Sequence, residues 1–253
     1  EIPVKLLEEQ RTLLNSYLKA TDSGKLSFTH IVGWALVKAL LRYPSLNNEF
    51  RTIDGKSYLI ARPDVNLGLA IDLQRPDGGR SLVVPNIKRS NTMDFRQFYE
   101  SYEMLVRKAR QGKLGPDDYA GTSISLTNPG TIGTNASVPR LMVGQGTIIA
   151  TGSINYPAAY QAMDAETLSE LGVSKVMQMT STYDHRIIQG AESGLFLAYV
   201  QELLTGEHGF YNEIFTSLQV PYKPLLWQRD RYPALFGINR DELIREQQQI
   251  LQL

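Results

Sequence analysis

Hydrophobic side chains recur at helical spacing near the start of the chain. From Pro3 to Leu18, leucines alternate with Lys, Glu, Gln and Arg, a spacing that predicts a helix with one buried stripe. A second helix is predicted to begin near Ser27 or Thr29, whose hydroxyls suit an N-cap, and to end before Pro44. Because nearly all of its side chains are apolar, we expect this second helix to be buried.

Shorter apolar runs then indicate β-strands. One covers residues 57–61, and two more cover 65–73 and 81–87. The Pro-Asp-Gly-Gly stretch from residue 76 favours a turn, so the last two strands are expected to form a hairpin. Three further strands are predicted later in the chain, at 122–127, 146–152 and 174–183.

Two later segments return to helical spacing. Asp94 opens a helix with one apolar stripe, and Lys108, Arg110 and Lys113 lie toward its carbonyl end, where cations suit the helix dipole. Residues 190–204 show a second apolar stripe. We therefore expect an α/β fold of the α+β sandwich type, in which helices pack on one mostly mixed β-sheet.

The periodic pattern of apolar residues is lost after residue 218. Beyond it stand three prolines with little periodicity, and then a polar, helix-prone stretch. We expect residues 1–218 to form the main domain and 219–253 to be a linker and the start of a following domain. The start at Glu1 and the abrupt end suggest a piece of a longer polypeptide.

Composition excludes several classes of protein. Lys plus Arg and Asp plus Glu both total 26, so no net charge attracts nucleic acid or an anionic membrane surface. The apolar runs are too short to cross a bilayer, and no leader segment opens the sequence, so we expect a cytoplasmic protein. Cysteine is absent, which excludes a cysteine nucleophile, and any thiol chemistry must therefore belong to a substrate.

The chain has three histidines, so candidates for a general base are few. His30 falls inside the buried helix pattern and His208 in a polar turn, and we expect structural roles for both. His185 directly follows a predicted strand and precedes the helix that begins near Gly190. Strand ends that lead into turns project polar groups into clefts, so His185 is the candidate base.

A second candidate group stands where another strand ends. The run Ser-Leu-Thr-Asn-Pro-Gly from Ser125 leads into a turn, so the hydroxyl of Thr127 could leave the sheet and donate to an oxyanion. The alternative is that Thr127 is one more strand residue before a plain turn.

Other motifs fail on inspection. Residues 121–125 resemble a nucleophile elbow but lack the final glycine and the helix. The glycine motifs of P-loop and Rossmann nucleotide-binding domains are both absent. The three histidines are dispersed and belong to no zinc-ligand motif, so we expect no metal site.

At this point the motifs resemble a known family. The run DHRIIQG, together with VNLGLAIDL, SLVVPNIK and GTSISLTNPGTIG, is similar to the catalytic domain of dihydrolipoamide acyltransferases of 2-oxo acid dehydrogenase complexes, which are related in fold to chloramphenicol acetyltransferase. More narrowly, SFTHIVGWAL and STYDHRIIQGAESG resemble fused actinobacterial enzymes. In those enzymes a succinyltransferase-like domain precedes a thiamine-dependent 2-oxoglutarate dehydrogenase or decarboxylase component.

The resemblance implies a mechanism without an acyl-enzyme. His185 would take the proton of a thiol, from coenzyme A or dihydrolipoamide, while Thr127 from a neighbouring subunit of a homotrimer binds the oxyanion. Asp184, Arg186 and Asn128 would support the site. A lipoyl domain would act in trans, and thiamine diphosphate and Mg would belong only to the fused downstream component.

Two departures from the family pattern stand out. The family motif usually has Asp where this chain has Gln189, just before Gly190; glutamine can supply hydrogen bonds to the loop but no charge pair. The chain also starts at a helix, without the strand and Arg-bearing segment expected ahead of it.

Two alternatives to an active succinyltransferase stay open. One is a catalytically weak or inactive trimerisation core for the fused component, with Gln189 as the sign of relaxed chemistry. The other is a free-standing antibiotic acetyltransferase of the same fold, which the length of the acyltransferase match disfavours.

Overall fold

The computed structural model describes residues 1–74 and 77–226. A six-stranded mixed sheet forms its centre, with strand order β1-β10-β9-β8-β4-β7. The strands β4 (Leu67–Leu69), β8 (Ile124–Thr127) and β9 (Thr147–Asn155) run parallel, while β10 (Val176–Tyr183) and β7 (Asn86–Ile87) are antiparallel to their neighbours. The predicted mixed sheet flanked by helices is confirmed.

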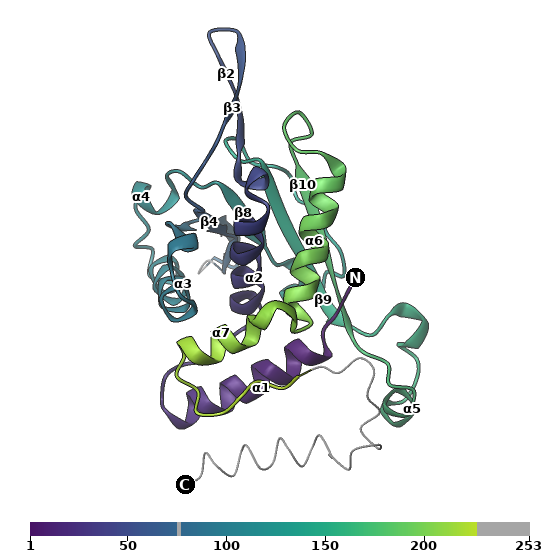
Figure 1. Ribbon diagram of the computed structural model, residues 1–253. Helices are drawn as coiled ribbons and strands as arrows, with labels where there is room; N and C mark the ends of the chain where they lie inside the picture. The colour runs from purple at the N-terminus through teal and green to yellow at the C-terminus, as the bar shows by residue number, and fades with distance from the viewer. Residues whose placement is uncertain (75–76, 227–253) are drawn as a thin grey trace.

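Helices pack on the sheet and against one another (Figure 1). The central helix is α2 (Phe28–Arg42), which contacts α3 (Phe95–Arg110) and α6 (Gly190–Leu204). The helices α1 (Lys5–Ala20) and α7 (Phe210–Ser217) lie together at the end of the molecule farthest from the hairpin of β2 (Glu49–Ile53) and β3 (Lys56–Ile60). Two shorter helices are α4 (Pro116–Tyr119) and α5 (Ala165–Glu170).

The apolar core lies between α2 and the sheet. Gly33 of α2 allows this close packing, because a Cβ there would lie 3.2 Å from Phe98 and 3.6 Å from Leu67. As predicted, α2 is buried, and Ser27 caps it by accepting a hydrogen bond from the backbone N–H of His30.

The predicted strand at 65–73 is in fact two strands. It divides into β4 and β5 (Ile71–Gln74), and the strand predicted at 81–87 divides likewise into β6 (Arg80–Val83) and β7. The predicted antiparallel pairing is confirmed, because β5 pairs with β6 and β4 with β7. Only the β4–β7 part belongs to the central sheet, since β5 and β6 form a separate two-stranded sheet.

A second hairpin projects from the fold at one end of the sheet (Figure 1). It consists of β2 (Glu49–Ile53) and β3 (Lys56–Ile60), joined by Asp54 and Gly55, both at positive φ. The sequence predicted β3 but missed β2. The Asp-Gly pair is a strong hairpin signal that could have revealed it.

The chain has a strand ahead of its first helix, so that expectation was wrong. The strand β1 (Ile2–Pro3) pairs with β10 at the edge of the central sheet, where backbone hydrogen bonding holds it although it is only two residues long.

Residues 219–226 pack back on the first helix. Leu225 is buried, the Tyr222 hydroxyl donates to the carbonyl of Leu13 at 3.2 Å, and Tyr17 donates to that of Gln219 at 3.0 Å. Residues 227–253 lie outside the described residues, and so does the predicted polar helical stretch. The boundary between 218 and 219 stays a prediction.

Gly146 supplies a test of the packing between the hairpin and the sheet. A Cβ at this position would lie 2.1 Å from the backbone oxygen of Asn48, so Gly146→Ala should lower the free energy of unfolding by about 1–3 kcal/mol through overpacking. Gly194→Ala is the control, because its Cβ would meet nothing within 4 Å in helix α6, and it should stabilise by roughly 0.5–1 kcal/mol. Urea denaturation measures both values, and equal stability of Gly146→Ala and the wild type would contradict the packing argument.

Candidate active site

His185 stands on the turn between β10 and α6. The backbone N–H of Asp184 donates to the carbonyl of Gly146 at 2.8 Å, and those of Ile187 and Ile188 donate to the carbonyl of Asp184 at 3.1 and 3.0 Å. The His185 side chain is exposed, and its ring centroid lies 5.4 Å from that of Tyr183. Within the described part of the chain, the imidazole has no hydrogen bond or ion pair, so its nitrogens are available to a substrate.

Asp184 and Arg186 form a bidentate pair on either side of His185. The Arg186 Nε and Nη2 donate to the two Asp184 carboxylate oxygens at 2.8 and 2.6 Å, and the Arg186 backbone N–H donates to Oδ1 at 3.1 Å. Hydrogen bonding from the guanidinium holds the pKa of the Asp184 carboxyl below its usual range, against the opposing effect of burial. The pair therefore fixes the backbone around the histidine.

Gln189 ends the turn as the N-cap of α6. Its backbone carbonyl accepts from Glu192 and Ser193, but its exposed side chain makes no hydrogen bond among the described residues. Gly190 follows as the first residue of the helix, and a Cβ there would lie 3.3 Å from the Tyr183 hydroxyl. The loop is thus held without the side chain of Gln189.

Thr127 is the last residue of β8 and is half-buried. The next side chain, Asn128, donates to the Thr29 hydroxyl at the start of α2 at 2.9 Å. Gly130 then lets the turn pack on β9, because a Cβ there would lie 2.3 Å from the Gly152 carbonyl. The end of β8 is therefore fixed to α2 and to β9.

One chain does not bring His185 and Thr127 together. Thr127 is level with Ala150 on β9, and Ala150 is level with Thr180 on β10. The strand β10 continues for three residues past Thr180 to Tyr183, about 10 Å at roughly 3.3 Å per residue, and His185 lies beyond that end on the turn. The two groups are therefore separated along the strand direction.

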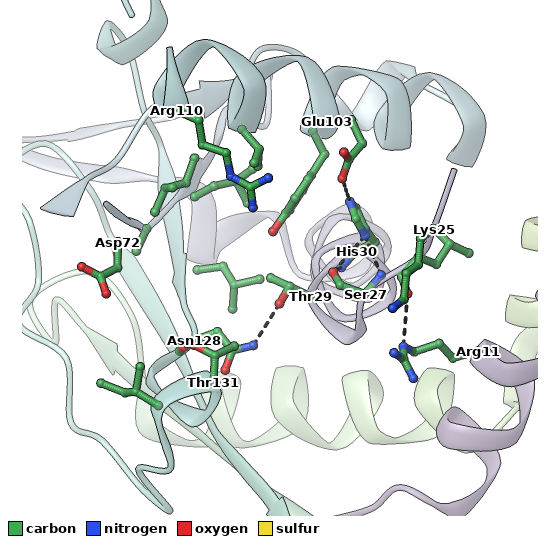
Figure 2. A pocket seen from close by; sticks show the side chains of 18 of the residues that line it. Arg11, Lys25, Ser27, Thr29, His30, Asp72, Glu103, Arg110, Asn128 and Thr131 are labelled. Carbon is green, nitrogen blue, oxygen red and sulfur yellow. Dashed lines mark hydrogen bonds and ion pairs between the residues drawn. The ribbon is translucent and has the colours of Figure 1, made fainter. Parts of the chain in front are cut away.

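A cavity of about 610 Å³ opens beside the end of β8 (Figure 2). Asn128, Thr29 and Thr131 line it, and Arg110 points into it from α3. Burial raises the pKa of Tyr102, which also lines the cavity, to about 12, against a hydrogen bond from Thr29 that favours the phenolate. The sequence predicted α3 but did not reveal this cavity, since its walls come from segments far apart in the chain.

The other two histidines have partners, as expected for structural roles. His30 is buried, its Nδ1 accepts from the Ser27 backbone N–H at 2.9 Å, and its Nε2 lies 3.0 Å from Glu103. The Nε2 of His208 lies 2.7 Å from the Glu202 carboxylate at the surface.

The comparisons with known proteins identify the family. The family described as 2-oxoacid dehydrogenases acyltransferase (catalytic domain) matches residues 1–209. This chain belongs to that family. The resemblance to the dihydrolipoamide acyltransferase family is thereby confirmed.

Several members of this acyltransferase family are close in sequence or fold. The chain is 52% identical over 229 residues to a multifunctional 2-oxoglutarate metabolism enzyme of Mycobacterium sp. (strain JLS), covering 90% of this chain and 18% of that enzyme. It is 52% identical over 230 residues to the 2-oxoglutarate dehydrogenase E1/E2 component of Corynebacterium glutamicum, covering 91% and 19%. The chain therefore spans less than a fifth of either relative.

A solved structure of this family has the same fold. The dihydrolipoamide acetyltransferase of Azotobacter vinelandii aligns with a TM-score of 0.63 at 25% identity, over 80% of this chain and 78% of that one. That enzyme was studied for the role of a serine, a histidine and an asparagine in its catalytic mechanism.

The described residues offer neither a membrane-spanning helix nor a cluster of metal ligands. None of their helices has both the length and the hydropathy needed to cross a membrane. No group of three or more His, Cys, Asp or Glu side chains among them is placed to hold a metal ion.

The Asp184–Arg186 pair predicts a pH-dependent contribution to stability. Because the folded-state pKa of Asp184 is lowered, the stabilisation is present above the unfolded pKa of about 3.9 and is lost as the pH falls through the lower folded-state value. Asp184→Asn should therefore cost about 1 kcal/mol at pH 7, a modest value because Arg186 is largely exposed, and progressively less below pH of about 4. Urea denaturation across this pH range measures the difference, and a constant difference at all pH values would argue against the pair.

Proposed function

We propose that this domain moves a succinyl group between dihydrolipoamide and coenzyme A within a 2-oxoglutarate dehydrogenase system. His185 is the general base and Thr127 is the oxyanion donor. The observation that carries the proposal is the exposed imidazole of His185, unpaired within the described residues and carried on a turn that backbone hydrogen bonds and the Asp184–Arg186 pair hold in place. The succinyl group is inferred from the relatives in 2-oxoglutarate metabolism.

The reaction transfers an acyl group from one thiol to another. The imidazole takes the proton of the attacking thiol as its sulfur bonds to the thioester carbonyl carbon, and the carbonyl oxygen becomes an oxyanion. The Thr127 hydroxyl donates a hydrogen bond to that oxyanion. When the intermediate collapses, the carbon–sulfur bond to the first carrier breaks and the imidazolium returns the proton to the departing thiolate.

A positioned base is needed for this step. The pKa of an ordinary thiol lies about two units above that of imidazole, a gap of roughly 2.7 kcal/mol, so proton removal has to accompany carbon–sulfur bond formation. A base held at a fixed place typically contributes about 10²- to 10⁴-fold to such a step. The hydrogen-bonded turn around His185 supplies this fixed place.

The complete site forms between subunits of a homotrimer in this proposal. The strand register supports it, because it separates the two groups of one chain along the strand direction. An imidazole from one subunit and a hydroxyl from the next would then meet at the interface.

The remaining partners follow from the relatives and from the acyl carrier. A lipoyl domain would deliver the acyl group in trans, and a fused component would use thiamine diphosphate and Mg, which have no assigned place in this domain. The name of the Corynebacterium glutamicum relative, an E1/E2 component, supports the fusion. The 2-oxoglutarate metabolism of the relatives supports a cytoplasmic location.

Gln189 is compatible with activity. In the Azotobacter vinelandii enzyme the named asparagine follows the named histidine by four residues, and Gln189 follows His185 by the same interval. Both side chains end in an amide, which offers the same donor and acceptor groups. A carboxylate at this place is therefore not essential to the proposal.

The alternative is a catalytically weak or inactive trimerisation core. The lack of any hydrogen bond to the Gln189 side chain among the described residues favours it, since a family carboxylate there would orient the loop. This alternative gives trimers of normal stability without acyl exchange even in the unmutated domain.

The activity test is acyl exchange between succinyl-CoA and dihydrolipoamide. His185→Ala should lower the exchange rate by about 10²- to 10⁴-fold, and Thr127→Val by about 10²- to 10³-fold, because each removes one group that acts in the transition state. His208→Gln is the matched control and should keep the wild-type rate, since His208 pairs with Glu202 at the surface. Full activity in His185→Ala, or none in the unmutated domain, would refute the proposal.

The interface test mixes two inactive variants. When His185→Ala and Thr127→Val subunits are co-expressed in equal amounts, about one quarter of the interfaces should combine an intact imidazole with an intact hydroxyl. Exchange activity should therefore recover to about one quarter of the wild-type value. Absence of recovery in verified mixed trimers would show that both groups must come from the same chain.

A further inference from the structure

Phe50 contacts the turn that carries His185. It lies on β2 of the projecting hairpin, and the guanidinium carbon of Arg186 stands 3.6 Å above the centroid of its ring. One edge of the guanidinium donates to Asp184, so the Phe50 ring occupies a face that this pair leaves free. A planar guanidinium suits both contacts at once.

The hairpin and the turn also meet at Gly146. The Asn48 carbonyl at the base of the hairpin approaches so closely that a Cβ on Gly146 would lie 2.1 Å from its oxygen. On the other side, the Gly146 carbonyl accepts the N–H of Asp184, and Ile188 is buried 3.3 Å from the same Cβ position. The hairpin thus has a defined place relative to the turn.

We propose that Phe50 is a positioning residue for His185. Its ring acts indirectly, by stacking on the guanidinium of Arg186. This inference rests on the proposed function, in which the imidazole of His185 takes the thiol proton. Phe50 itself touches no reacting atom in it. The ring restricts the guanidinium to the orientation that pairs with Asp184, and the two residues next to the histidine are thereby held together.

Exposure explains why Asp184 needs this support. The Arg186 side chain is 62% exposed, so water competes with the carboxylate for its donors, whereas the Asp184 side chain is 11% exposed. A ring below the guanidinium adds a favourable cation–π contact and removes rotamers that lead away from Asp184. Without the ring, the hydrogen bond from the Arg186 backbone N–H to Asp184 would fluctuate more. The direction of the His185 imidazole would then fluctuate as well.

The kinetic test compares variants of Phe50 in the acyl-exchange assay. Phe50→Ala should lower kcat about tenfold with unchanged KM for succinyl-CoA and for dihydrolipoamide, because a misplaced base slows the proton-transfer step without altering binding. Phe50→Tyr and Phe50→Trp should restore kcat, since both keep an aromatic face, and Phe50→Leu should fall between.

Leu59 provides the matched control. It is the cross-strand partner of Phe50 on β3, and as an aliphatic side chain it offers Arg186 no ring to stack on, so Leu59→Ala weakens the hairpin and keeps the Phe50 ring. It should keep the wild-type kcat. Equal losses in Phe50→Ala and Leu59→Ala, or a rise in KM alone, would overturn the inference.

A second measurement does not depend on activity. Amide hydrogen exchange of residues 184–188, followed by mass spectrometry, should be at least about threefold faster in Phe50→Ala than in Leu59→Ala and the wild type. Unchanged exchange would refute the positioning role. An unmutated domain that fails to exchange acyl groups would instead refute the proposed function, and hydrogen exchange would still decide whether Phe50 orders the turn.

Discussion

The hydrogen-bond register of β8, β9 and β10 is the constraint on which the arrangement of this domain depends. It sets Thr127 level with Thr180 and leaves His185 beyond the far end of the sheet. A one-residue slip of a strand would turn its side chains to the other face, and would expose the buried residues of β8 and β9, so this register is strongly specified. In the proposed mechanism, the imidazole and the hydroxyl would therefore come from different chains.

The turn around His185 combines exposure with order. The imidazole is open to solvent, while the backbone on either side of it is hydrogen-bonded within the turn and to Gly146, the residue just before β9. Rigid neighbours and an exposed reactive group are common where loops on a fixed scaffold carry function. Here the scaffold includes a distant hairpin, since Arg186 lies between Asp184 and Phe50.

Local patterns predicted much of this fold because they report local causes. The apolar stripe at 190–204 predicted α6, and the strand-like run at 174–183 predicted β10 to within a few residues. The run at 65–73 looked like one strand because its spacing does not show where pairing changes partner, from the central sheet to the β5–β6 hairpin. The strand β2 was missed because charged residues interrupt its pattern. Helix α7 was also missed, although the polar turn that contains His208 comes directly before it, because its eight residues make only about two helical turns of apolar spacing.

The candidate site likewise has a part that the sequence could indicate and a part that only the fold reveals. The exposed His185 and its Asp184–Arg186 neighbours lie within three consecutive residues, so the sequence brought them to attention. The Phe50 contact and the walls of the cavity beside Asn128 join segments that only the folded chain brings together. Sequence also could not place Thr127 relative to His185, since that relation depends on pairing across three strands.

The close approach of Asn48 and Gly146 has an evolutionary consequence for the chain. Any side chain at residue 146 would collide with a main-chain oxygen, which no choice of rotamer elsewhere can relieve. Glycine at position 146 is therefore expected to tolerate substitution poorly. Insertions in the tip between β2 and β3, by contrast, would lengthen a projecting loop and leave the crossing point at its base untouched.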